Sequence, residues 1–158
     1  MRILGLDSSG IVASVAVVED DVLVAEYTIN YKKTHSQTLL PMLDEIVKMT
    51  ELDLESIDAI AVAAGPGSFT GLRIGSATAK GLGLALKKPL VAIPTVEGLA
   101  YNLYDTPGLI CPIMDARRKQ VYTGTPSPRK VTGCPYAFNF LIISSTGTAI
   151  CSSTVSSL

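Results

Sequence analysis

Small residues recur at every fourth position of one segment, at Gly71, Gly75, Ala79 and Gly83. Residues four apart share one face of an α-helix, so the spacing predicts a helix over 70–86 with a stripe that holds nothing larger than a methyl group. Each interior glycine costs a helix about 1 kcal/mol relative to alanine. A close neighbour must therefore offset this cost. The sequence leaves open whether that neighbour is the chain's own sheet or a helix of another protein.

The pattern around this helix predicts an α/β fold. Three strands in succession come first, and helices then alternate with strands, an order that favours a mixed central sheet flanked by helices. It is the order of a ribonuclease H-like lobe of the actin-like ATPase (ASKHA) fold. We expect strands over 3–6, 12–18, 22–29, 57–64, 90–93 and 109–115, and further helices after Ser36 and from Thr95 to Tyr104.

The amino-acid composition changes near Thr123. From there to the end the sequence is rich in serine and threonine and has no acidic residue. We expect a lobe over residues 1–123 and an atypical Ser/Thr-rich tail over 124–158, which is disordered by its composition. A hairpin that returns to the sheet edge is the alternative.

Composition narrows the class of protein. The net charge of −1 argues against a self-sufficient nucleic-acid binder. Three cysteines (Cys111, Cys134 and Cys151) without a CxxC pair, and a single histidine, predict reduced thiols and no zinc site. The N-terminus is too polar for a signal peptide, and the 70–86 helix carries Arg73 and Lys80. We therefore expect a cytoplasmic protein with no membrane span.

Two loops carry candidate chemistry. Asp7, Ser8 and Ser9 follow the first strand, where a carboxylate and hydroxyls can hold magnesium or a nucleotide phosphate such as that of ATP or ADP; Asp-Ser-Ser-Gly is also ordinary turn chemistry. The loop from Gly65 to Ser68 either binds an anion at the start of a helix or makes a sharp turn in which Ser68 or Thr70 caps that helix.

For two further features the sequence also leaves two interpretations. His35, the only histidine, is either a general base or a packing residue at a helix entrance. The cluster Asp115, Arg117, Arg118 and Lys119 is either a solvated turn or a grip for a phosphate or an acidic partner.

The sequence resembles one family closely. The matching segments run in order from Met1 to about Tyr122, and GPGSFTGLRIG together with HSQTLLP is highly specific. They are similar to the TsaB (YeaZ) family of tRNA threonylcarbamoyladenosine biosynthesis subunits. The matching segments are ILGLDSS, ASVAVVED, THSQTLLPMLDEIV, IDAIAVAAGPGSFTGLRIGSATAKGLGLAL and IMDARRKQVY.

The resemblance implies a non-catalytic scaffold subunit. It would bind a TsaD-like catalytic paralogue, work with a TsaE-like ATPase, form a homodimer in isolation and meet tRNA only indirectly. The paralogue's histidine metal motif has no histidine counterpart in residues 94–100. A helix-packed interface is implied for His35, Leu39, Met42, Leu43, Ile46, Gly71, Gly75, Ala79 and Gly83. The rival functions are a small actin-fold nucleotide phosphotransferase using Asp7 and a glycoprotease-like peptidase using His35.

The tail departs from the family, whose members continue into a second lobe. We expect residues after about Gly124 to arise from a frameshift or an altered coding sequence. This departure puts nucleotide binding in doubt, because such sites lie between two lobes.

Overall fold

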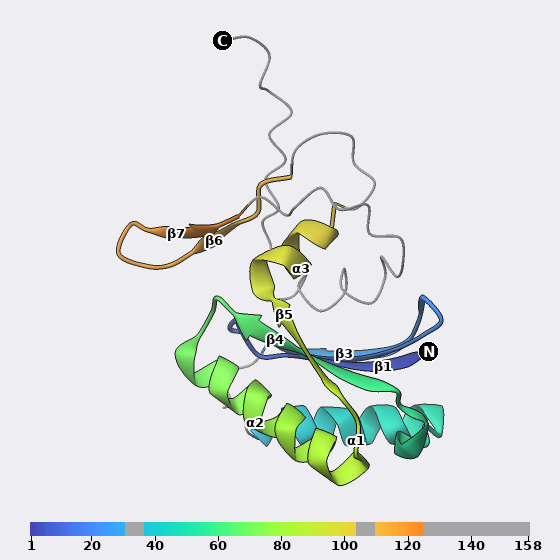
Figure 1. Ribbon diagram of the computed structural model, residues 1–158. Coiled ribbons are helices and arrows are strands. Elements are labelled where there is room, and N and C mark those ends of the chain that lie inside the picture. The colour runs from blue at the N-terminus through green and yellow to red at the C-terminus, as the bar shows by residue number, and fades with distance from the viewer. Residues whose placement is uncertain (31–36, 104–109, 125–158) are drawn as a thin grey trace.

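The fold is built on a five-stranded mixed sheet with the strand order β3-β2-β1-β4-β5. The first three strands form an antiparallel meander, while β4 and β5 run parallel to β1. The computed structural model describes residues 1–30, 37–103 and 110–124 (Figure 1). The sheet strands are β1 (Arg2–Asp7), β2 (Ala13–Glu19), β3 (Val22–Ile29), β4 (Ala59–Gly65) and β5 (Leu90–Pro94).

The helices connect the parallel strands as the sequence predicts. A short 3-10 helix, η2, precedes β4. The three α-helices are α1 (Leu39–Thr50), α2 (Phe69–Leu86) and α3 (Thr95–Tyr101), and η2 spans Leu54–Ser56. The α/β mixed-sheet fold is thus confirmed.

The last predicted strand differs from expectation. We predicted one strand over 109–115, but β6 is only Ile113–Asp115, and it pairs with β7 (Val121–Thr123) in a separate two-stranded sheet. The apolar run alone did not show that an exposed turn follows directly and folds β7 back onto β6. The tail over 125–158 and the cysteines Cys134 and Cys151 lie outside the described residues.

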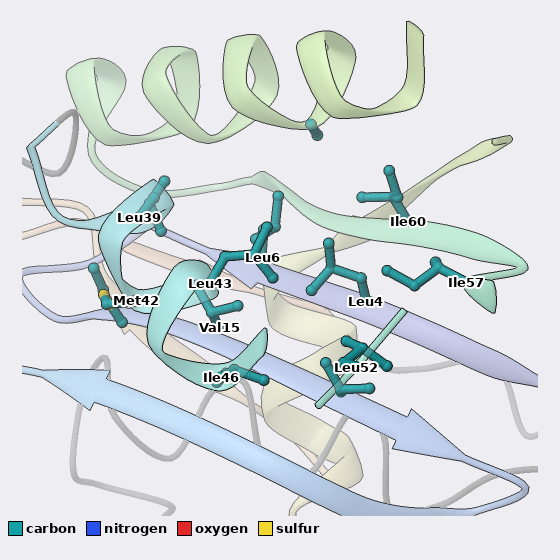
Figure 2. Packing of buried hydrophobic residues seen from close by; sticks show 13 residues of the cluster. Leu4, Leu6, Val15, Leu39, Met42, Leu43, Ile46, Leu52, Ile57 and Ile60 are labelled. Carbon is teal, nitrogen blue, oxygen red and sulfur yellow. The ribbon is translucent and has the colours of Figure 1, made fainter. Parts of the chain in front are cut away.

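The main core lies between the sheet and its first two helices (Figure 2). α1 packs against β2 and β3, and α2 against β4 and β1. Leu4, Leu6 and Val15 point from the sheet into this layer. From α1 come four buried side chains at helical spacing, Leu39, Met42, Leu43 and Ile46. Such burial of apolar area is the main stabilising term of the lobe.

The small-residue stripe of α2 faces the chain's own sheet. Gly71, Gly75, Ala79 and Gly83 are all buried. A Cβ at Gly75 would overlap the hydroxyl of Ser8, and one at Gly83 would lie 2.8 Å from Leu90 Cδ2. The absence of side chains lets α2 lie close to the strands beneath it.

These positions are covered within the chain itself. The stripe contacts the strands beneath α2, and an interface through it stays a prediction. The same holds for the apolar side of α1, which fills the core. Helical spacing identified buried faces correctly, but burial within the chain and burial against a partner give the same pattern.

The second face of the sheet carries a smaller cluster. Leu99 of α3 packs there with Ala16 of β2 and Met114 of β6. Figure 1 shows α3 on the side of the sheet opposite α1 and α2. No helix in the described part of the chain is long and apolar enough to cross a membrane.

Candidate functional site

The carboxyl ends of three parallel strands meet at one edge of the sheet. β1 ends in Asp7, β4 ends in Gly65, and β5 leads directly into Thr95 at the start of α3. Ligand sites of open α/β sheets lie at this edge. The edge is therefore the first place to test for the chemistry that Asp7, Ser8 and Ser9 suggest.

Asp7 and its neighbours are buried and bonded into the turn. The Asp7 side chain is 1% exposed, and its Oδ1 accepts the backbone N–H of Ser9 at 2.7 Å. The Ser8 hydroxyl donates to the carbonyl of Gly71 at 2.9 Å. The Asp7 bond shapes the loop after β1, and the Ser8 bond ties that loop to the first turn of α2.

The loop before α2 packs against Ser9 in the loop after β1. The N–H of Ser68 donates to the carbonyl of Ser9 at 2.6 Å, and a Cβ at Gly67 would overlap that carbonyl oxygen. Gly65 has φ +105°, where glycine is favoured over residues with a side chain. The Ser68 hydroxyl accepts the N–H of Gly71 at 3.3 Å and caps α2. Of the two predicted caps, Ser68 is confirmed.

At the start of α2, two backbone N–H groups have partners within the chain. The Ser68 N–H donates to the Ser9 carbonyl and the Gly71 N–H to the Ser68 hydroxyl, and Gly67 brings this loop against Ser9. Binding of a nucleotide phosphate by Asp7, Ser8 and Ser9 stays a prediction. In the described ranges, no group of three or more histidine, cysteine, aspartate or glutamate side chains is placed to hold a metal ion.

Two hydroxyls at this edge are buried without a hydrogen-bond partner among the described residues. They are Ser9 Oγ and Thr95 Oγ1. The sequence analysis took Thr95 only as the start of a helix. Its place after a buried parallel strand was the available signal.

The outward side of α2 has a different character. We call Phe69, Arg73, Ala77, Lys80 and Leu84 the outer face of α2. Phe69 is 69% exposed and Leu84 is 84% exposed. The guanidinium of Arg73 lies 4.0 Å from the centre of the Phe69 ring, a cation–π contact. A shallow hollow follows this side of the helix and is lined by Phe69, Leu72, Arg73, Ser76, Ala77 and Lys80.

The sequence pattern of small residues predicted the stripe of α2 and not its outer face. Phe69, Arg73 and Ala77 are also spaced by four, on the side of the helix away from the glycines. The exposed Phe69, beside Arg73 and the shallow hollow, makes this side of the helix a candidate contact surface. His35 lies outside the described residues, so its predicted place in an interface is untested.

Fold and loops together define the class of this chain: it is a ribonuclease H-like lobe of the actin-like ATPase fold, with its strand-end loops closed on each other. The family model described as "TsaD: tRNA N6-adenosine threonylcarbamoyltransferase" matches residues 22–132. The chain belongs to this family.

Individual relatives agree with this assignment. The chain is 41% identical over 124 residues to the tRNA threonylcarbamoyladenosine biosynthesis protein TsaB of Bacillus subtilis (strain 168), covering 78% of this chain and 54% of that protein. It is 35% identical to the TsaB protein of Escherichia coli (strain K12), covering 77% and 53%. The solved structure of YeaZ from Pseudomonas aeruginosa superposes with a TM-score of 0.71 at 31% identity, covering 80% and 61%.

The chain thus spans about half the length of the curated relatives it matches.

Proposed function

We propose that this chain is a non-catalytic partner subunit in tRNA threonylcarbamoyladenosine modification. It binds a TsaD-like catalytic paralogue and supports the transfer carried out there, together with a TsaE-like ATPase in the cytoplasm. The relatives named above are biosynthesis proteins of this modification. The observation that carries the proposal is the exposed outer face of α2.

The outer face has the composition of a docking surface. Phe69 and Leu84 supply apolar area at its two ends, and Arg73 and Lys80 lie between them. Aromatic and arginine side chains are enriched in the cores of protein interfaces. The partner helix that fits this face is apolar and carries acidic side chains that meet the two cations.

The same face accounts for a homodimer in isolation. The outward side of α1 carries Asp44 and Glu45, and exposed Leu40 and Met49 flank them. Asp44 and Glu45 both pair with Lys48 of the same helix, so in this proposal the contact between α1 of one copy and α2 of another is mainly apolar. In the complex with the paralogue, the paralogue takes the place of the second copy.

In this proposal the strand-end loops have a structural role. Asp7, the residue on which a phosphotransferase would depend, accepts a hydrogen bond within its own turn and is 1% exposed. A nucleophile or metal-binding carboxylate has to reach its substrate. The rival peptidase function depends on His35, outside the described residues.

A pull-down with matched variants tests the proposal. We expect the wild-type chain to retain the TsaD-like paralogue and the variant Phe69→Ser/Leu84→Ser to lose at least nine-tenths of it. The control Ile11→Ser/Val22→Ser removes two apolar side chains outside the helices that are also mostly exposed, and it should retain the paralogue. Equal retention by all three proteins contradicts the proposed face, and no retention by the wild type contradicts the partner.

A further inference from the structure

The β6–β7 hairpin carries the most concentrated positive charge of the described residues. Figure 1 shows it projecting away from the five-stranded sheet. Its tip holds three consecutive basic residues, Arg117, Arg118 and Lys119, and all three are exposed. Within the part of the chain that the structure describes, none of them belongs to an ion pair.

The backbone of this tip is unusual. The φ angles of Arg117, Arg118 and Lys119 are 63°, 51° and 62°, in the left-handed region that residues with a Cβ seldom adopt. A turn that had only to reverse the chain would be easier with glycine or asparagine at these positions. Local strain of this kind gathers at functional sites, which makes the tip a place to look for one.

Hydrogen bonds hold the tip in this conformation. The N–H of Ala116 donates to the carbonyl of Gln120 at 3.0 Å, and the N–H of Gln120 donates to the carbonyl of Arg117 at 3.0 Å. Asp115 Oδ1 accepts the N–H of Arg117 at 2.7 Å. The one acidic residue of the hairpin thus helps to shape the turn.

The strands below the tip add an exposed aromatic ring. Tyr122 and Val121 of β7 are both exposed, and so is Ile113 of β6. Nucleic-acid-binding proteins use two-stranded ribbons of this kind in grooves, basic side chains on phosphates, and aromatic rings under unpaired bases. An acidic protein segment would use the cations and leave the tyrosine without a role.

We propose that the β6–β7 hairpin is an RNA-contact element, in which Arg117, Arg118 and Lys119 bind the phosphate backbone of a structured RNA. The choice of a tRNA as that RNA rests on the proposed function. The contact is local: the whole chain has a net charge of −1, so its affinity comes from this tip rather than from the protein's overall field. In the complex, the hairpin adds one anchoring point to the RNA bound by the paralogue.

The test measures binding of an unmodified tRNA transcript to the full chain by fluorescence anisotropy. The tip variant Arg117→Gln/Arg118→Gln/Lys119→Gln should bind at least tenfold more weakly than wild type. The control Lys48→Gln/Lys87→Gln/Lys88→Gln makes the same change in net charge elsewhere and should stay within twofold. Phosphate contacts release counterions, so the slope of log K against log salt should flatten by about 2 to 3 in the tip variant only.

A second comparison separates lost charge from lost folding. Arg117→Lys/Arg118→Lys keeps the charge and should keep binding within about fivefold. If this variant loses binding as completely as the glutamine variant while its thermal unfolding is normal, phosphate contact by charge is contradicted.

Other outcomes overturn the proposal directly. An equal loss in the tip variant and in the lysine control would show that only net charge matters. Tighter binding of polyglutamate than of the transcript would assign the hairpin to an acidic protein. The anisotropy measurement contains no paralogue, so its result is independent of the pull-down. If the pull-down fails but the tip variant weakens RNA binding, only the partner role is contradicted. If the pull-down succeeds but the tip variant binds RNA like wild type, only the RNA contact is contradicted.

Discussion

Gly67 is the residue at which the loops after β1 and β4 come closest. Its Cα faces the carbonyl of Ser9, and the neighbouring Ser68 N–H donates to that same carbonyl. Gly65 in the same loop is required by its positive φ, whereas Gly67 is required by close approach. Two glycines two residues apart therefore serve two different physical needs.

Substitution of Gly67 tests this contact. We expect Gly67→Ala to lower the free energy of unfolding by about 1 to 3 kcal/mol, because a methyl group meets backbone that cannot move aside. Urea unfolding followed by circular dichroism measures the change. An unchanged midpoint would mean that the two loops are not locked together.

At the scale of the element, α2 has two faces with opposite requirements. The buried face needs small residues because the Ser8 hydroxyl occupies the space beside Gly75 and bonds to the carbonyl of Gly71. The outer face carries the large residues Phe69 and Leu84. A single helix thus couples the strand-end loop to the surface proposed for docking.

A double-mutant cycle measures the coupling between Ser8 and Gly75. Gly75→Ala alone should destabilise the chain by about 1 to 2 kcal/mol, since the hydroxyl must leave its hydrogen bond. In a Ser8→Ala background the same change should cost less, and the interaction energy should exceed about 0.5 kcal/mol. Thermal or urea unfolding of the four proteins gives these values.

Gly81 provides the matched control on the same helix. A Cβ there meets nothing within 4 Å, so Gly81→Ala should stabilise the chain by up to about 1 kcal/mol through helix propensity alone. Equal effects at Gly75 and Gly81 would contradict close packing of α2 on the sheet.

Sequence patterns predicted the helices and strands more accurately than they predicted what each of them packs against. The apolar spacing of Leu39, Met42 and Ile46 predicted α1, and alternation of strands and helices predicted the sheet, because periodicity follows backbone geometry. The spacing of Gly71 and Gly75 showed a close contact but did not identify what makes it. Only the tertiary structure shows which surface covers these glycines.

The candidate site shows the same limit. A carboxylate after a strand was visible in the sequence, but the bond from Ser9 N–H to Asp7 that uses it was not. The pairing of β6 with β7 depends on a turn of three positive-φ cations, which no propensity rule predicts.

At the scale of the whole molecule, the two clusters of buried hydrophobic residues lie between Leu4 and Met114. The lobe expected over residues 1–123 stays a prediction, and a truncated chain tests it. A chain ending at Gly124 should unfold cooperatively with a midpoint within a few degrees of that of the full chain, measured by calorimetry. A broad transition without a heat-capacity peak would show that residues 125–158 are needed for folding.

The most direct test of the central claim, docking without chemistry, is threonylcarbamoylation of tRNA by the TsaD-like paralogue and the TsaE-like ATPase with this chain added. Asp7→Asn keeps an oxygen acceptor for Ser9 N–H but removes the charge; Leu84→Lys alters only the outer face of α2. We expect full support by Asp7→Asn and at least a tenfold loss with Leu84→Lys. Loss of support with a folded Asp7→Asn, together with full support by Leu84→Lys, would contradict it.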